Sequence, residues 1–340
     1  MGEAVELARL NALHHQISAI DGEIAHLFQE RLLLAEEAER CGKSLEYMSK
    51  DATIPAPMAG FHFETGELPA TARVACQGVE GAFSHQAADH FFKEPQVLFR
   101  AQFEEVFQAV AAKEVDYGVL PIENSTAGSV GAVYDLMRKY HFYIVKEAKV
   151  PVAHCLLAKP GTRLEELTEV YSHQQALSQC EAYLAAHPRL QPLTYSNTAA
   201  AAKYIADAGA SGQAAIASRK CAAMYGLEII AEDIQDISHN TTRFICISRE
   251  PVFAAGANKL SLCLTLPHKP GSLYHLLNKF AINQMNLTKL ESRPWPERNF
   301  EFMFYLDVEG NLNDLKTRLL LEDLNNQLGY FKILGSYNEA

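Results

Sequence analysis

The sequence predicts an α/β protein in three parts: an N-terminal helix, a two-lobed central domain and a small ferredoxin-like βαββαβ domain. Three observations predict this arrangement. Short apolar runs alternate with helical stretches from residue 73 to residue 248, which is typical of α/β sheets. Two extended segments, 142–158 and the SHNTTR stretch at 238–243, are placed to cross between two lobes and leave a ligand cleft. After residue 259 the order of elements becomes strand, helix, strand, strand, helix, strand.

The N-terminal segment, residues 4–41, has no Pro and one Gly, and it predicts a long amphipathic helix. Its apolar stripe follows a spacing of three and four residues and is formed by Leu10, Leu13, Ile17, Ile20, Ile24, Leu27, Leu34 and Ala38. Arg31 stands where the spacing calls for an apolar residue. We expect the stripe to pack against a partner helix or another subunit, because a lone helix would expose it. Residues 1–48 therefore form a helical segment, and residues 49–71 read as a linker.

The central domain is expected over residues 72–250, with one lobe at about 72–150 plus 240–250 and the other at 151–239. Its expected strands are 73–77, 96–99, 117–122, 142–150, 152–158, 169–172, 191–196, 213–218, 228–233 and 243–248. Its expected helices are 84–93, 103–112, 128–140, 174–187, 198–208 and 218–226. This alternation favours parallel sheets.

The C-terminal domain is expected over residues 258–340. Its strands are KLSLCLTL (259–266), MNLTKLESRPW (285–295), NFEFMFYLDVEG (299–310) and YFKILGSY (330–337), and its helices are 270–284 and 311–327.

Composition excludes several classes of function. The net charge of −11 argues against a sequence-independent nucleic-acid binder or a protein of anionic membrane surfaces, whereas a small anionic substrate is still allowed. The seven cysteines are scattered without a CxxC pair, which favours buried thiols over disulfides or zinc ligands. We expect no metal site and no cofactor. The N-terminus lacks a signal-peptide pattern and no apolar run reaches membrane-spanning length, so we expect a soluble cytoplasmic protein.

Four polar motifs stand at turns of the central domain. In QGVEGAFSHQAADHFF (77–92), two glycines permit a tight turn and Ser84 falls at a helix start, where free N–H groups can hold a carboxylate. In PIENSTAGSV (121–130), Asn124 offers a donor and an acceptor between Glu123 and Ser125.

In the third motif, YSHQQAL (171–177), Ser172 precedes a helix that presents Gln175 in its first turn. In the fourth, SHNTTR, Thr241 and Thr242 offer hydroxyl donors, and Arg243 offers a cation that matches a carboxylate. Taken alone, each of the first three motifs is more typical of an ordinary polar turn or surface helix, and the fourth is equally typical of a solvated turn. Their expected convergence on one cleft favours a binding site.

As a set, these motifs resemble the prephenate dehydratase family. GVEGAFSHQAA, PIENSTAGSV, SHQQAL, the NTAAAA run from Asn197 and NTTRF occur in that family's order and approximate spacing, over residues 72–250. The resemblance implies a two-lobed fold like that of periplasmic binding proteins. It also implies the conversion of prephenate to phenylpyruvate in L-phenylalanine biosynthesis, with loss of carbon dioxide and water.

The resemblance also implies roles for individual residues. Thr242 is expected to donate to the leaving hydroxyl, and Asn124 and Gln175 are expected to position prephenate. As substrate-binding residues we expect Ser84, Glu123, Ser125, Ser172, Thr241 and Arg243.

The tail resembles the ACT regulatory domain that accompanies this enzyme. The matching motifs are Gly271, Ser272 and Leu273, and Glu291, Ser292 and Arg293, followed by Pro294. The resemblance implies that both motifs bind L-phenylalanine as a feedback effector between neighbouring subunits, in a homodimer or homotetramer.

The N-terminal helix resembles the first helix of an AroQ-type chorismate mutase, including Asp21 and the Glu30–Arg31 pair. The second and third mutase helices are missing, so we expect an inactive remnant. Three alternatives stay open for the whole chain: an arogenate dehydratase, a bifunctional mutase and dehydratase, and a non-catalytic two-lobed amino-acid sensor.

Overall fold

The structure is a computed structural model that describes residues 66–338, except 255, 296, 297 and 299, together with scattered positions between 9 and 34. Those scattered positions are helical, and among them Leu13, Ile20, Leu27 and Leu34 are exposed. Most of the expected linker and of the expected mutase-like segment lies outside the described residues. The chain divides into two compact units. One contains 64–261, 291–293 and 333–340, and the other contains 262–290 and 294–332.

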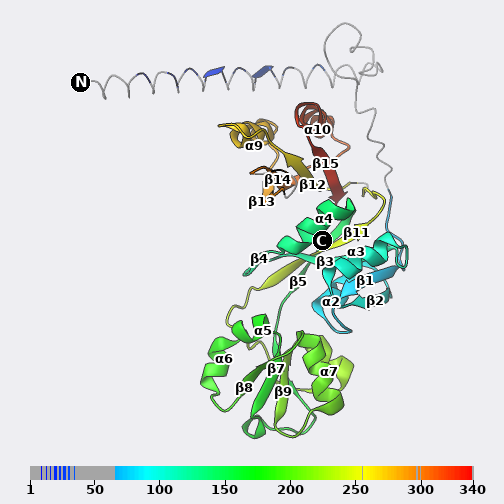
Figure 1. The fold of residues 1–340 in the computed structure, drawn as a ribbon, viewed down its shortest axis with the longest axis vertical. Coiled ribbons are helices and arrows are strands. Elements are labelled where there is room, and N and C mark those ends of the chain that lie inside the picture. The colour runs from blue at the N-terminus through cyan, green and yellow to red at the C-terminus, as the bar shows by residue number, and fades with distance from the viewer. Residues whose placement is uncertain are drawn as a thin grey trace, which may run out of the picture. The chain divides into compact units, whose positions relative to one another are not determined.

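The first lobe is built on a six-stranded sheet in the order β2-β1-β3-β11-β5, with β4 paired to β3 (Figure 1). Its elements are β1 (Arg73–Gln77), α2 (Phe83–Phe91), β2 (Gln96–Arg100), α3 (Phe103–Ala111), β3 (Tyr117–Asn124), β4 (Gly128–Ser129), α4 (Gly131–Tyr140), β5 (Tyr143–Pro151) and the returning β11 (Thr241–Ser248). The sheet is mixed, because β11 pairs antiparallel with both β3 and β5. The expected parallel pairing is confirmed for β1 with β2 and β3. It is wrong for β11, which returns from the other lobe and so runs in the opposite direction.

The second lobe has a five-stranded sheet in the order β10-β6-β9-β7-β8. Its elements are β6 (Cys155–Ala158), a short 3-10 helix (Leu164–Glu166), β7 (Glu169–Ser172), α5 (Gln174–Ser178), α6 (Glu181–Ala186), β8 (Gln191–Thr194), α7 (Thr198–Ala208), β9 (Gln213–Ala217), α8 (Arg219–Tyr225) and β10 (Glu228–Ala231). This sheet is mixed too, since β6 runs antiparallel to β9 and β10.

The single helix expected at 174–187 is in fact two helices, α5 and α6. Asp236 explains the break, because its carboxylate accepts hydrogen bonds from the backbone N–H groups of Glu181 and Ala182, at 3.1 Å each. A carboxylate at that place caps a new helix start and favours ending the preceding helix there.

Each lobe buries its own apolar core. In the first lobe, Val74, Val119 and Phe244 of the sheet pack with Ala88 and Phe91 of α2. In the second lobe, α7 packs its alanines closely against β9 on one face of the sheet, and α5 covers the other. The six described cysteines are buried thiols.

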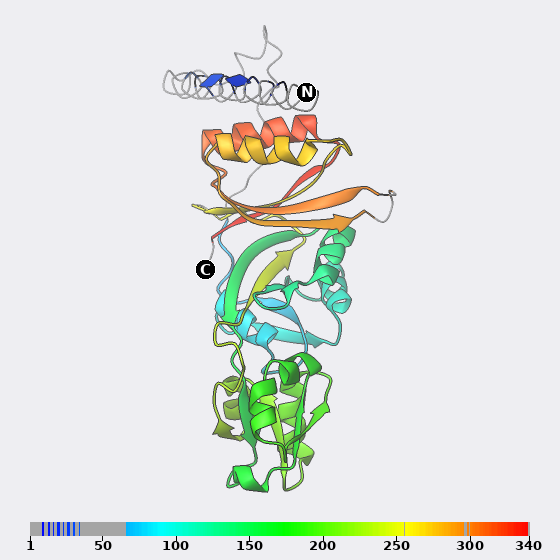
Figure 2. The ribbon, with the colours of Figure 1, turned by 90° about the vertical axis from the view of Figure 1, so that its left-hand side faces the viewer.

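The C-terminal elements are β12 (Lys259–Thr265), α9 (Ser272–Ile282), β13 (Leu287–Pro294), β14 (Phe302–Glu309), α10 (Leu315–Gln327) and β15 (Phe331–Tyr337). The sheet order is β13-β14-β12-β15, and α9 and α10 lie side by side along it (Figure 2). The predicted βαββαβ order is confirmed. Gly271 stands at the start of α9 with φ of 83°, a left-handed conformation that glycine adopts without the cost of a Cβ.

Candidate active site

A cavity of about 520 Å³ is lined by side chains from both lobes of the central domain. The first lobe contributes the ends of β1 and β3, the starts of α2 and α4, and one face of β11. The second lobe contributes His154, α5 and the start of α7. The polar motifs expected to converge on a cleft therefore do meet around one space.

The two lobes also contact each other between the loop after β1 and α8. The Tyr225 hydroxyl donates to the Glu80 carbonyl at 2.6 Å, and Gln86 donates to Ser218 Oγ at 3.2 Å. A Cβ at Gly81 would lie 3.0 Å from Cys221 Sγ, and Gly81 has φ of 81°. Both the space and the backbone conformation therefore require glycine at this lobe contact.

Four helix N-termini border the cavity. The N-cap residues of α2, α4, α5 and α7, which are Ala82, Val130, His173 and Asn197, all line it. The first turn of a helix leaves N–H groups without intrahelical partners, and its dipole favours negative charge. Among the described residues that line the cavity there is no Lys, Arg, Asp or Glu. An anion in this cavity is therefore met by main-chain dipoles and neutral polar side chains.

Asn124 and Thr242 form the polar centre of the cavity wall. Asn124 Nδ2 donates to Thr242 Oγ1 at 2.9 Å and to Asn240 Oδ1 at 2.8 Å. Asn124 Oδ1 accepts from the backbone N–H and hydroxyl of Thr126, at 3.1 and 2.7 Å, and from the N–H of Ala127 at 2.9 Å. These bonds hold both the Asn124 side chain and the turn that follows it.

The bond from Asn124 decides what the Thr242 hydroxyl can do. A hydroxyl carries one proton, and here its oxygen already accepts an N–H, so the proton is left to donate. No acceptor for that proton occurs among the residues that the structure describes. Thr242 lines the cavity and is only 9% exposed, so a ligand in the cavity would receive this donor away from bulk water.

Two further predicted site residues, Ser84 and Gln175, also line the cavity. The Ser84 hydroxyl donates to the Gln77 carbonyl, so its proton is committed and the hydroxyl itself does not donate to a carboxylate. Gln175 stands in the first turn of α5, where its backbone N–H donates to His173 Nδ1 at 3.3 Å.

Five residues that were expected to bind substrate do not line the cavity. Successive side chains of a strand point to opposite faces. On β3, Asn124 points to the cavity and Glu123 points to the opposite face of the sheet. On β11, Thr242 points to the cavity and Thr241 and Arg243 point to the opposite face. Ser125 follows β3 and bonds the backbone of Thr241. Ser172 is buried and donates to the Ile216 carbonyl at 2.6 Å.

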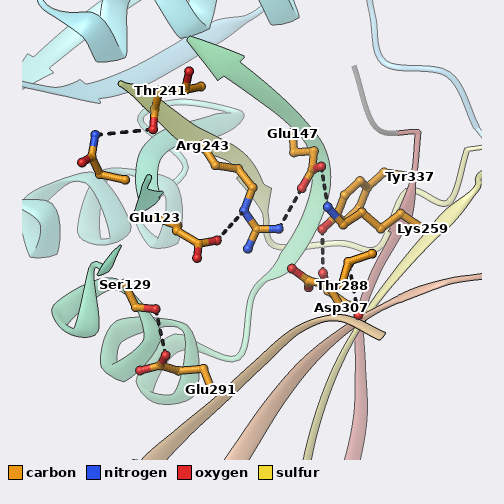
Figure 3. Close-up of polar contacts among 12 residues, drawn as sticks. Glu123, Ser129, Glu147, Thr241, Arg243, Lys259, Thr288, Glu291, Asp307 and Tyr337 are labelled. Atoms are coloured by element: carbon orange, nitrogen blue, oxygen red, sulfur yellow. Dashed lines mark hydrogen bonds and ion pairs between the residues drawn. The ribbon is translucent and has the colours of Figure 1, made fainter. Parts of the chain in front are cut away.

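Arg243 instead belongs to a buried ionic network. Figure 3 shows its guanidinium between Glu123 and Glu147, with Lys259 on Glu147 as well. Arg243 Nη1 lies 3.1 Å from Glu147 Oε2, and Lys259 Nζ lies 2.7 Å from Glu147 Oε1. Glu147 is fully buried, so these two cations compensate its charge.

Sequence reasoning missed His154, which lines the cavity in the stretch between β5 and β6 and is 1% exposed. Its Nε2 lies 3.0 Å from Oε1 of Gln179, another cavity residue, and its Nδ1 has no hydrogen-bond partner among the described residues. Burial lowers the pKa of His154, so the neutral ring is favoured. The sequence does contain a feature that could have indicated His154: it is a polar residue inside the apolar run VAHCLLA (152–158).

The residues expected to bind an effector lie on α9 and β13. Gly271 precedes α9, and Ser272 and Leu273 begin it, whereas Glu291, Ser292 and Arg293 lie on β13. Glu291 and Arg293 contact the first lobe of the central domain.

A family model described as "PDT: Prephenate dehydratase" matches residues 74–252. The chain belongs to the prephenate dehydratase family. Arogenate dehydratase 1 of Petunia hybrida is 38% identical over 314 residues, which cover 86% of this chain and 72% of the relative. Arogenate dehydratase/prephenate dehydratase 2, chloroplastic, of Arabidopsis thaliana is 39% identical over 297 residues, with 84% and 77% covered. The protein is thus an enzyme of the prephenate and arogenate dehydratase family.

Solved structures show the same fold. Prephenate dehydratase from Arthrobacter aurescens, in complex with L-Phe, matches with a TM-score of 0.72 and 31% identity, over 79% of this chain and 90% of that one. A protein described as a quorum quenching acylase, GqqA, matches with a TM-score of 0.71 and 30% identity, over 78% and 97%.

The expectation of a cytoplasmic protein is contradicted by these comparisons. Two Arabidopsis thaliana relatives, 39% and 35% identical to this chain, are described as chloroplastic. No helix among the described residues is both long and apolar enough to cross a bilayer. Within the same part of the chain, no group of three or more His, Cys, Asp or Glu side chains is placed to hold a metal ion.

Proposed function

We propose that this chain is a prephenate dehydratase that converts prephenate to phenylpyruvate, carbon dioxide and water. The observation that carries the proposal is the Thr242 hydroxyl, whose oxygen accepts from Asn124 and whose proton is left to donate in the cavity. A ring hydroxyl that leaves as hydroxide needs such a donor, because proton donation neutralises the charge that develops on the departing oxygen.

In the proposed mechanism the substrate dianion is held by the N-termini of α2, α4 and α7. The C–O bond of the ring hydroxyl breaks as the ring carboxylate leaves as carbon dioxide. The electron pair of the broken C–C bond completes the aromatic ring. Thr242 donates to the departing hydroxide, which becomes water, and regains a proton from solvent. Asn124 orients the Thr242 oxygen, and Gln175 positions the substrate from α5.

The lining of the cavity favours prephenate over arogenate. Arogenate carries an ammonium group where prephenate carries a keto oxygen. A buried ammonium is costly unless an anion pairs with it, and the described cavity residues include neither Asp nor Glu. A keto oxygen needs only a hydrogen-bond donor, which N–H groups and side-chain amides supply. The names of the relatives support either substrate.

One experiment tests both parts of the proposal. Purified protein is incubated separately with prephenate and with arogenate, and phenylpyruvate and phenylalanine are measured by chromatography. We expect kcat/KM to be higher for prephenate. A higher kcat/KM for arogenate would overturn the substrate assignment. Absence of aromatic product from both would overturn the proposed function.

We further propose that L-phenylalanine regulates the enzyme through the C-terminal domain, with Gly271, Ser272 and Leu273 and the Glu291–Arg293 segment in its binding site. The bound L-Phe of the Arthrobacter relative supports phenylalanine as the effector. Feedback requires that phenylalanine bind one state of the enzyme more tightly than another. The proposed assembly is a homodimer or homotetramer, and the exposed, heptad-spaced Leu13, Ile20, Leu27 and Leu34 support self-association. A monomer by light scattering would contradict it.

A further inference from the structure

One short hairpin connects the cavity to strand β13. Its strands, β3 and β4, pair Asn124 with Gly128 and Glu123 with Ser129. Gly128, Ser129 and Val130 line the cavity. On its other side, the Ser129 hydroxyl donates to Glu291 Oε2 at 2.8 Å, as Figure 3 shows.

Arg293 makes a second contact to the same region. Its Nη2 lies 2.8 Å from Asp135 Oδ2 in α4, and its guanidinium packs against Gly131 at the start of that helix. A Cβ at Gly131 would lie 2.6 Å from Arg293 Nη1, so any larger residue would displace the guanidinium. Gly131, the second glycine of GSVGAV, therefore leaves room for the Arg293 guanidinium from β13.

Glu291 and Arg293 are two residues apart on β13, so their side chains lie on the same face of the strand, whereas Ser292 lies on the opposite face. One face of β13 thus holds the hairpin at two points, Ser129 and the start of α4. Ser129 and Gly131 lie within ten residues of the chain after Asn124, which donates to Thr242, and Asp135 is the eleventh residue after it. Because Asn124 and Gly128 are paired in register, a movement at Ser129 displaces the end of β3 that carries Asn124.

We infer that Glu291 and Arg293 are positioning residues for the dehydratase reaction, which hold the β3–β4 hairpin so that Asn124 presents Thr242 to the substrate. This role rests on the proposed function and is separate from effector binding. It also links the two: an effector that drew these side chains away from Ser129 and Asp135 would lower turnover, and by linkage substrate would weaken effector binding.

A double-mutant cycle in the full-length chain tests the inference without added phenylalanine. The variants are Ser129→Ala, Glu291→Gln and the two combined, with kcat and KM measured on whichever substrate the wild type converts. We expect each single change to lower kcat by roughly threefold to tenfold, and the double variant to be no slower than the slower single variant. KM should change less than kcat, because the affected group acts on the departing hydroxyl.

Variants of the Arg293–Asp135 ion pair provide a second, independent test. Arg293→Gln should lower kcat similarly, and Arg293→Lys should restore much of it, because lysine keeps the charge opposite Asp135. The matched control is Glu301→Gln, a carboxylate of the same domain that pairs with Arg298 at 3.3 Å and should leave kcat unchanged. Thermal melts confirm that each variant is folded.

The outcomes separate this inference from the proposed function. Wild-type protein that converts neither substrate would refute the proposed function. An active wild type, with unchanged kcat in Ser129→Ala and Glu291→Gln, or with losses that simply multiply in the double variant, would refute the positioning role. A change confined to the response to phenylalanine would do the same.

Discussion

Replacing Thr242 by valine removes one hydroxyl and keeps the β-branched shape of the side chain. The wall of the cavity is therefore preserved, and only the donor disappears. Thr242 Oγ1 is the acceptor of one Asn124 N–H at 2.9 Å, while Asn240 Oδ1 accepts from the same amide at 2.8 Å. Asn124 thus keeps a partner in the variant.

This geometry predicts unequal effects on stability and turnover. Loss of one hydrogen bond that is partly compensated costs about 1 kcal/mol of folding free energy. Loss of one preorganised donor to a developing oxyanion lowers kcat by about 10²-fold to 10³-fold, or about 2.7–4 kcal/mol of the activation free energy. Thr242→Val should therefore be a well-folded enzyme with very low turnover, and Thr242→Ala should lose at least as much.

The assay follows phenylpyruvate from prephenate under saturating conditions, alongside urea unfolding of each variant. Thr242→Ser keeps the hydroxyl and should recover most of the turnover. Thr168→Val is the matched control, because Thr168 Oγ1 donates to the Gly212 carbonyl at 3.3 Å, outside the cavity. If Thr242→Val kept more than about a tenth of wild-type kcat, the donor role would be wrong.

Three further predictions concern charge. Glu147→Gln should lower the free energy of unfolding by about 3–5 kcal/mol in urea titrations, because Arg243 and Lys259 lose their buried counter-charge; a change below about 1 kcal/mol would contradict the buried network. Asn124→Asp should lower kcat and raise KM for the substrate dianion in steady-state assays, because it removes the N–H donor and adds negative charge. If both kcat and KM stayed at their wild-type values, the proposed role of Asn124 in substrate binding would be wrong. The pKa of His154 in the folded chain is lower than its ordinary value of 6.5. As the pH falls below 6.5, the imidazole therefore takes up a proton in the unfolded chain but stays neutral in the folded chain. Stability should therefore fall as pH falls from about 7.5 to about 5.5, and His154→Gln should flatten that fall in urea titrations; an equally steep fall in the variant would refute the assignment.

The alternation of apolar runs and helical stretches was enough to predict the elements. Strands such as 73–77 and 169–172 and the helix 198–208 agree with the structure to the residue. Periodicity reports local burial, and burial of one face is what defines these elements. Parallel pairing is correct for β1 with β2 and β3 and for β7 with β8 and β9. It is wrong for β11, because the direction in which β11 returns depends on the lobe between its neighbours.

The polar motifs predict a cleft, and Ser84, Asn124, Gln175 and Thr242 from the four motifs line one cavity. The motifs predict Asn124 and Thr242 together with their neighbours Glu123, Thr241 and Arg243. Strand alternation places these three neighbours on the opposite faces of β3 and β11. The sequence pattern predicts that this strand begins at Arg243, whereas β11 begins two residues earlier, at Thr241, so strand alternation applies to Thr241 and Thr242 only once the structure is known.

The sequence by itself determined the kind of protein: two α/β lobes, a βαββαβ domain, and polar turns in an order that one enzyme family shares. Local patterns carry that information because each element buries its own face and each turn needs particular residues. Only the tertiary structure decided which side chains act together. The Thr242 hydroxyl accepts a hydrogen bond from Asn124, which is 118 positions away in the chain, and Arg243 pairs with the buried Glu147. Such pairings depend on which strands become neighbours and on which face each side chain points to.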